Sequence, residues 1–529
     1  MAFENLTGSH TGEYLAQTVL DVLHRYDIRD RLGCITTDNA SNNITMAKEL
    51  QRKLRNIGTE WDASTSHIPC MAHVVNLCVQ RFMSATSEKA KELEEDQVSP
   101  IKVILEKIRS IARAHRAGQL RREKWVQCCQ HNGLPPLMIP TDVTVRWNST
   151  YHMLERALYL RQAIERYCFE MRKELPDSNL TDEEWELAEI LLLILYPFKR
   201  CTKRFESDLA KSEITYVFFA YDTLYDHVDD MKDTFADEAL QNVLPWATYL
   251  LDAVNAMEDI LRKYYARTSL PTVYGDAMIL NPRYKLTIFD KESWESEDPA
   301  PYVEGCRRRF NQFYNHQSTQ SSIPSDELDE PSKRATSVNG QKTITTVSED
   351  KEYLHAMRKR SRTSLTNEFD NYIQAPPDPE IDSPLAWWKS HEDRYPKMAQ
   401  MARDILSVPA SGSGVERQFS VTGRLATWQR HRLAPKNVSN SMIYKAHLAA
   451  TKFKPIKGDD GQTYDLDEAD AEESIPMLVD NVMPPEWADG WYYQKTKGKD
   501  ADEVVERNFR IAVDEVLDRR AEVDDDIYG

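Results

Sequence analysis

The sequence predicts an α/β protein in which helices greatly outnumber strands. Two short extended runs, at residues 32–37 and 66–70, alternate with helical patterns near the start of the chain. This alternation is typical of an α/β sheet covered by helices. Between residues 83 and 380 the regular patterns are helical, which predicts a large all-α block after the small sheet.

The α/β part contains three predicted helices and two predicted strands. The first helix spans Thr11–Tyr26, and an apolar strand at Leu32–Thr37 follows it. Ser41 or Asn42 can serve as N-cap of the second helix. A second extended run, Ser66–Cys70, leads into the third helix. The predicted order is therefore helix, strand, helix, strand, helix.

The all-α block begins with a basic helix at Ile101–Trp125, which carries eight basic and two acidic residues and is a candidate phosphate-binding surface. Thr181 opens a capping box, and its helix is expected to end before Pro197. Further helical patterns cover Ile214–Val228 and Ala239–Tyr265.

The charge of the chain is concentrated at its end. The formal net charge is −18, but residues 454–529 alone carry −13 and the rest only −5. The acidity of the whole chain is therefore no argument against DNA binding by its body. The eight cysteines form no regular framework, which favours a reducing compartment. Every apolar run is too short for a membrane span, so no membrane partner is expected.

Three segments combine residue types that carry chemistry. Asp38 follows the first strand, at the end where α/β sheets bind ligands and metals. Cys70 and His73 form a Cys-x-x-His element after the second extended run. Glu416 and Arg417 follow a Gly/Ser-rich loop. Taken alone, an aspartate in such a place is more often a turn or helix cap than a catalyst.

These segments, in this order, resemble the hAT superfamily of cut-and-paste DNA transposases, the hobo and Activator type. The resemblance also includes Leu6–Ala16, Thr141–Tyr151, Asp276–Lys285 and Trp387–Leu433, and it continues to about Leu448. Several long motifs in the same order make the resemblance specific. It implies a nuclear protein that binds transposon-end DNA and forms a homodimer or a higher oligomer.

The resemblance also implies a domain organisation. Residues 1–82 would form part of an RNase H-like core, and residues 83–380 a helical insertion that contains a disordered loop at about 318–350. Residues 381–453 would be the hAT C-terminal dimerisation region, which completes the core. Residues 454–529 form the acidic tail. The expected fold is thus an incomplete RNase H-like core interrupted by a large all-α insertion.

In the family, three carboxylates hold two divalent metal ions for DNA strand cleavage and joining. By motif, Asp38 matches the second carboxylate and Glu416 the third, and Mg²⁺ or Mn²⁺ would be the metal. Zinc is the competing interpretation of Cys70 and His73, with Cys78 as a third ligand. We do not expect zinc, because no second ligand pair stands at the spacing of a zinc finger.

The resemblance further implies DNA contacts. His73 would lie near the scissile phosphate, with Cys70 as a structural neighbour. Arg146 and Trp147 match an Arg-Trp pair whose tryptophan stacks near an extruded base, although a core tryptophan is the alternative. Arg417, beside the third carboxylate, is a further candidate for DNA contact.

The family's first carboxylate lies on a strand upstream of the motif that begins here at Gly8, and no such strand precedes it. We therefore hypothesise that Met1 is an internal methionine and that the BED-type zinc module is absent. Because the first carboxylate is missing, the chain is expected to be inactive as given, and the strand at Cys34–Asp38 is expected to have an unpaired edge. The alternatives are a domesticated, non-enzymatic DNA-binding and dimerising protein, and a helical scaffold in which Asp38 and Glu416 are structural and far apart.

Overall fold

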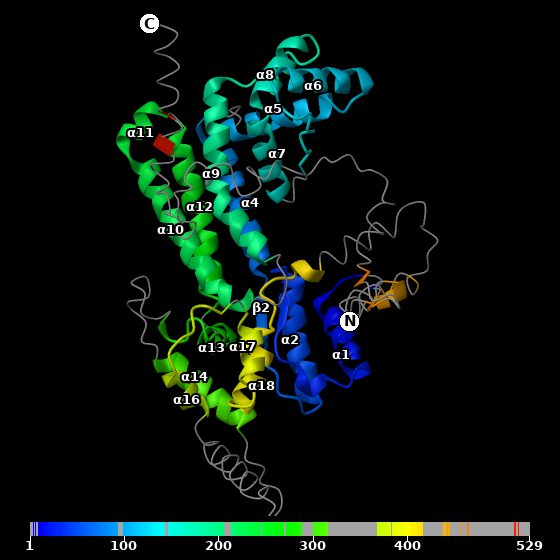
Figure 1. Ribbon diagram of the computed structural model, residues 1–529, viewed down its shortest axis with the longest axis vertical. Helices are drawn as coiled ribbons and strands as arrows, with labels where there is room; N and C mark the ends of the chain where they lie inside the picture. Colours follow the sequence, from blue (N-terminus) through cyan, green and yellow to red (C-terminus); the bar gives the residue numbers. More distant parts are fainter. Residues whose placement is uncertain are drawn as a thin grey trace, which may run out of the picture. The chain divides into compact units, whose positions relative to one another are not determined.

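A computed structural model of the chain forms two compact units. Unit 1 contains residues 1–207, 218–269 and 410–529, and unit 2 contains residues 208–217 and 270–409. Helices predominate among the described residues and the strands are short, as predicted (Figure 1). The structure describes residues 4, 6, 9–93, 99–142, 147–205, 213–244, 246–268, 271–287, 300–315, 368–381, 383–415, 437, 439–441, 443–444, 456–457, 463–464, 513–514 and 517.

The beginning of unit 1 has the predicted alternation of helices and strands. The two strands are parallel, with Ile35 opposite His67 and Thr37 opposite Pro69. In the described part of the chain, this sheet has two strands. The elements are α1 (Gly12–Arg25), β1 (Ile35–Thr37), α2 (Ser41–Asn56), the short α3 (Ala63–Ser66), β2 (His67–Pro69) and α4 (Met71–Leu93).

Helices α1 and α2 pack closely against each other beside this sheet. Thr11 is the N-cap of α1, and its hydroxyl accepts a hydrogen bond from the Tyr14 amide at 3.3 Å. Next to it, Gly12 touches the backbone of α2 so closely that a Cβ there would lie 2.8 Å from the Met46 nitrogen and 2.6 Å from the Thr45 Cβ. The Thr-Gly pair of the first motif therefore has a structural role.

Replacing Gly12 with alanine is expected to push α1 away from α2 and to destabilise unit 1 by about 1–3 kcal/mol. The cause is overpacking, because the new methyl group meets helix backbone that cannot turn aside. Urea unfolding of the full chain measures the loss. Gly33→Ala is the control, since a Cβ at Gly33 meets no atom within 4 Å. Equal stability of both variants would contradict this explanation.

The helical part of unit 1 is built on three long helices. The α4 helix packs against α12 and α9, and Figure 1 shows them side by side. This continuity differs from the expected domain boundary at 82/83, which falls inside α4. The elements are α5 (Pro100–Ala114), α6 (Gln119–His131), α7 (Trp147–Tyr159), α8 (Arg161–Glu170), α9 (Asp182–Phe205), α10 (Tyr216–Ala236, whose first two residues fall in unit 2), α11 (Glu238–Val243) and α12 (Ala247–Tyr265).

Three helix predictions in this part differ from the structure, and one of them is the pattern at Ala239–Tyr265, which is divided into α11 and α12. The expected basic helix at Ile101–Trp125 is two helices: α5 ends at Ala114, and Gly118, whose φ of 146° does not fit a helix, is the N-cap of α6. The expected helix end before Pro197 is also wrong, since α9 continues to Phe205. Phe198 and Phe205 are fully buried, and their packing offsets the roughly 3 kcal/mol that an internal proline costs. The Thr181 capping box is confirmed by its reciprocal hydrogen bonds with Glu184.

His115 lies in the break between α5 and α6 and is completely buried. Its ring stacks on Trp125 at a centroid distance of 4.9 Å, and its Nε2 accepts a hydrogen bond from the Ile139 amide at 3.3 Å. Burial, with a smaller contribution from nearby Arg116, lowers the pKa of His115 to about 3. The neutral imidazole is therefore part of the folded state.

Stability of unit 1 is expected to fall as the pH drops below about 6.5, where His115 of the unfolded chain takes up a proton and the folded chain does not. Between pH 7 and pH 5 this one group accounts for a loss of about 2 kcal/mol. Urea unfolding at several pH values measures it. In His115→Gln, whose amide oxygen can still accept from Ile139, that part of the pH dependence should disappear. An unchanged pH profile would exclude His115 as the cause.

Unit 2 is organised around the motif Asp276–Lys285. Two side chains bond to the end of α13: the Tyr372 hydroxyl donates to the Ile279 carbonyl, and the Trp388 indole donates to the Leu280 carbonyl. The elements are η3 (Glu213–Thr215), α13 (Val273–Leu280), α14 (Ala300–Arg309), the π-helical η6 (Phe310–Tyr314), α16 (Glu368–Gln374), α17 (Pro384–Ser390) and α18 (Pro396–Leu406). In the turn after α13, the Asn281 side chain accepts a hydrogen bond from the Arg283 amide. This motif is thus the structural centre of unit 2.

None of the helices among the described residues combines the length and the apolar composition that a membrane crossing requires. The predicted disordered loop at about 318–350 lies outside the described residues. So does most of the predicted acidic tail, in which the structure describes two short strands, β3 (Ile456–Lys457) and β4 (Thr463–Tyr464), paired antiparallel.

Candidate functional site

Asp38 stands directly after β1, as the sequence predicted, and its side chain is exposed. Its Oδ1 atom accepts hydrogen bonds from the Ala40 amide at 3.0 Å and from the Asn43 Nδ2 at 2.6 Å. This carboxylate therefore closes the turn into α2, whose N-cap is Ala40 instead of the predicted Ser41 or Asn42. The turn holds one carboxylate oxygen in place and directs the group away from the packed core.

Cys70 and His73 lie beside this strand end. The Cys70 amide donates to the Thr37 carbonyl at 2.8 Å, which joins the residue before Asp38 to the start of α4. The His73 amide donates to the Cys70 carbonyl in the first turn of α4, and the His73 side chain is partly exposed. Asp38 and the Cys-x-x-His element, about thirty residues apart in the chain, therefore share one end of the sheet.

The loop that leads to Glu416 reaches the same place. The Met71 amide donates to the Ala410 carbonyl at 2.9 Å, and the Gly412 amide donates to the Cys70 Sγ at 3.2 Å. The Ser413 hydroxyl donates to the Phe205 carbonyl at the end of α9. The structure thus brings residues 410–415 to the Asp38 end of the sheet, across a sequence separation of more than 340 residues. Glu416 and Arg417 themselves lie outside the described residues.

The Arg-Trp motif is anchored by an ion pair that sequence reasoning missed. Asp142, whose side chain is 4% exposed, accepts two hydrogen bonds from Arg109 of α5, at 2.8 and 2.5 Å. It also accepts one from the Thr150 hydroxyl at 2.9 Å. Burial raises the pKa of Asp142, but the bonds from Arg109 and Thr150 outweigh it, so the net pKa is lowered. Both Asp142 and Thr150 belong to the motif Thr141–Tyr151. The charged residue Asp142 within this motif was the feature of the sequence that could have indicated the ion pair.

Trp147 begins α7 and is 6% exposed, with its ring edge-on to Tyr151 at a centroid distance of 6.5 Å. In this arrangement its indole packs in the protein, and stacking on a base would require it to leave that packing. Arg146, its partner in the motif, lies outside the described residues. The hydrogen bond between Thr150 and Asp142 joins two residues that lie on either side of Arg146 in the sequence.

The basic residues expected to bind phosphate on α5 and α6 are mostly engaged within the protein. Lys107 pairs with Glu184 at 2.6 Å, and Lys124 lies 3.4 Å from Glu170. Arg109 pairs with Asp142, and Arg113 and Arg116 also have partners within unit 1. Pairing neutralises the charge that a phosphate would meet, so the surface offers less than the sequence suggests. Lys102, Arg121 and Arg122 have no ion-pair partner among the described residues.

The described residues contain no group of three His, Cys, Asp or Glu side chains placed to hold a metal ion. Of the metal ligands expected from the sequence, Asp38 is the described one and contributes a single exposed carboxylate. Cys78, the third ligand in the zinc alternative, is buried in α4, and burial raises the pKa of its thiol to about 12.

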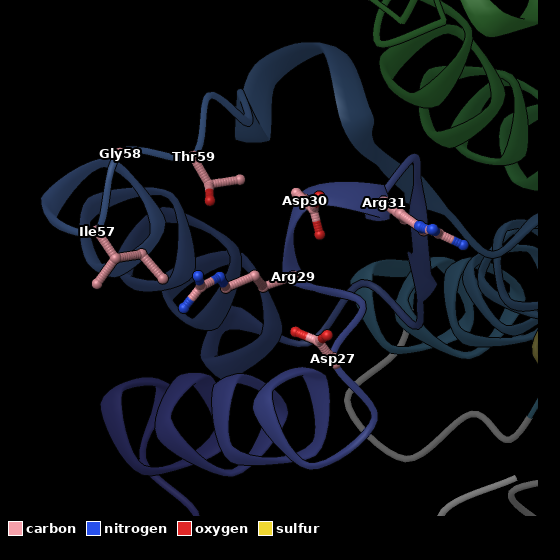
Figure 2. A pocket seen from close by; sticks show the side chains of 7 residues that line it. All are labelled: Asp27, Arg29, Asp30, Arg31, Ile57, Gly58 and Thr59. Carbon is pink, nitrogen blue, oxygen red and sulfur yellow. The ribbon is translucent and has the colours of Figure 1, made fainter.

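An open polar hollow of about 340 Å³ lies between the ends of α1 and α2 (Figure 2). It is on the side of the residues that precede β1, whereas Asp38 follows β1. Cationic and anionic side chains share it, so no single ligand charge is favoured. It is lined by Asp27, Arg29, Asp30, Arg31, Ile57, Gly58 and Thr59. This hollow is separate from the candidate site.

Three family models match the chain. The ZBED1 RNase-like domain matches residues 1–62, and the ZBED1 RNase-like helical domain matches residues 68–193. The hAT family C-terminal dimerisation region matches residues 368–448. The matched segments contain the motifs described above, from the Thr11-Gly12 pair at the start of α1 to the loop before Glu416.

Curated relatives agree with these matches. The putative transcriptional regulator tpeD of Talaromyces stipitatus is 30% identical over 86% of this chain and 50% of its own length. The putative AC transposase of Zea mays is 26% identical over 85% of this chain and 53% of its own length. The zinc finger BED domain-containing protein RICESLEEPER 3 of Oryza sativa is 22% identical over 82% of this chain and 55% of its own length. The chain spans about half the length of these relatives. It belongs to the hAT family of transposases and transposase-derived proteins.

Proposed function

We propose that the chain is a transposase-derived nuclear protein that binds DNA at the Asp38 end of its small sheet and associates with itself through its C-terminal region. The observation that carries this proposal is the convergence of β1, the Cys-x-x-His element and residues 410–415 on one place. Loops at the carboxyl end of parallel strands are where α/β sheets bind ligands. The matched dimerisation region supports self-association.

The site has the residue types that phosphodiester chemistry uses. Asp38 and Glu416 would hold Mg²⁺ or Mn²⁺, which would polarise a phosphate and activate the attacking oxygen. The side chain of His73, in the first turn of α4, would contact the phosphate, and Arg417 would add positive charge near it. Arg146 and Trp147 would contact bases or flanking phosphates. An RNase H-like core that contains β1 and is interrupted by helical residues is the fold that we propose for this function.

DNA binding and cleavage are tested together on the full chain with hairpin and nicked DNA, in the presence of Mg²⁺ or Mn²⁺. Binding that weakens with salt, and cleavage that disappears in Asp38→Asn and Glu416→Gln while binding remains, is the expected result for a transposase. Light scattering measures self-association. A chain that binds no DNA at low salt would contradict the proposal.

A non-enzymatic DNA-binding protein is the second candidate. It is favoured by the name of the 30% identical relative, a putative transcriptional regulator. In this case the same assay gives salt-dependent binding and self-association without cleavage, and Asp38→Asn leaves both unchanged. The cleavage readout therefore separates the two candidates.

A further inference from the structure

We propose that the Cys70 thiol is a positioning residue that ties residues 410–415 to the end of the sheet that carries Asp38. Cys70 contacts three segments at once: β1, the start of α4 and the loop before Glu416. The role of this contact in a DNA-binding site rests on the proposed function. The position of the loop against Cys70 is independent of that function.

The thiol acts both as donor and as acceptor. Its Sγ accepts a hydrogen bond from the Gly412 amide at 3.2 Å and donates to the Ser411 Oγ at 3.6 Å. The Ser411 Oγ in turn accepts from the Ser413 amide at 3.1 Å. The Cys70 thiol and the Ser411 hydroxyl therefore accept hydrogen bonds from two consecutive backbone amides of the loop, those of Gly412 and Ser413. In this arrangement both the donor and the acceptor capacity of the thiol are used within the protein.

Backbone hydrogen bonds fix the same junction from both sides. The Cys70 amide donates to the Thr37 carbonyl at 2.8 Å, and the Met71 amide donates to the Ala410 carbonyl at 2.9 Å. Thr37 immediately precedes Asp38 in the chain, and the loop ends at Val415, immediately before Glu416. The segments leading to both candidate carboxylates are thus bonded to one dipeptide, Cys70–Met71.

These hydrogen bonds are expected to stabilise the loop because the groups that make them are shielded from water. Cys70 is 2% exposed and Ser411 is 6% exposed, and Ser413 is also buried. If the thiol is removed, the Gly412 amide loses its acceptor and the Ser411 oxygen keeps only the Ser413 amide as a donor, and the loss of a buried hydrogen bond is costly. The loop is then expected to open more often than in the wild-type protein.

Hydrogen–deuterium exchange of the full chain, followed by mass spectrometry, tests this proposal. Cys70→Val keeps an apolar group of similar size but removes both hydrogen bonds, and Ser411→Ala removes the second half of the network. Both variants are expected to raise the exchange rate of a peptide covering residues 412–415 by about tenfold. Cys70→Ser is expected to restore part of the protection, because its hydroxyl can still accept from Gly412 and donate to Ser411.

Gly412→Ala is the matched control. A Cβ at Gly412 would meet the Cys70 Sγ at 3.9 Å, an ordinary van der Waals distance, so the amide can still donate to the thiol. Its exchange should match the wild type. The proposal is overturned if Cys70→Val and Ser411→Ala both leave the exchange of this peptide unchanged, or if Gly412→Ala raises it equally.

DNA binding by the wild-type chain, measured in parallel, separates this inference from the proposed function. Failure to bind DNA would count against the proposed function alone, because the exchange experiment measures the position of the loop without DNA.

Discussion

Replacing Asp142 with alanine is expected to destabilise unit 1 by about 3–5 kcal/mol, because it leaves the guanidinium of Arg109 without its buried partner. The carboxylate accepts two hydrogen bonds from Arg109 and one from Thr150, so three donors lose their acceptor in a site largely closed to water. Urea unfolding of the full chain, followed by circular dichroism, measures the change.

A second carboxylate on the same arginine provides the control. Glu106 bonds to Arg109 at 2.7 Å, but its side chain is half exposed, so Glu106→Ala should cost less than about 1 kcal/mol. In the double variant Asp142→Ala, Arg109→Met, which no longer buries an unpaired charge, much of the stability should return. Equal losses from Asp142→Ala and Glu106→Ala would show that the buried pair does not anchor this motif.

Replacing Lys285 with methionine is expected to destabilise unit 2 by about 2–4 kcal/mol. Lys285 is 3% exposed, and its Nζ donates to the carbonyls of Tyr372 and Ala375, both at 2.7 Å. The ammonium also lies 4.2 Å from the centre of the Tyr372 ring. Burial, with a smaller contribution from Arg394, lowers the pKa of Lys285 to about 8, so losing the charge relieves part of the cost. The two carbonyls left without a donor outweigh that relief.

Pulsed hydrogen–deuterium exchange during urea unfolding, followed in a peptide that contains the buried Trp388, reports on unit 2. The matched control is Lys389→Met, which removes an exposed lysine from α17 of the same unit and should change stability by less than about 0.5 kcal/mol. A Lys285→Met variant as stable as Lys389→Met would mean that the two carbonyls find other donors, and the proposed role of Lys285 would be wrong.

Much of the fold near the start of the chain was predictable because its signals are local. The helix at Gly12–Arg25 with its Thr11 cap, the strand ending at Thr37 and the extended run before Cys70 follow from periodicity and capping within a few residues. The helix through Pro197 was not predictable in this way, because the packing of α9 on its neighbours outweighs a local rule.

For the candidate site, the sequence singled out Asp38, Cys70 and His73, and the structure places them at one end of the sheet. It did not indicate that Asp142 anchors the Arg-Trp motif, because its partner Arg109 lies 33 residues away. Nor did it indicate that most of the basic residues near Arg109 are paired within the protein. Charge in a sequence is visible, but the partner of each charge depends on how helices pack.

Patterns along the chain were enough to predict the family, the order of helices and strands at its beginning, and the residue types of the candidate site. These depend on patterns read along the chain, where each residue's neighbours are known. Two contacts became visible only in the folded chain: the loop at residues 410–415 is bonded to Cys70, and Lys285 joins the turn after α13 to α16. Such contacts join residues far apart in sequence, and they form because burial leaves their polar groups no other partners.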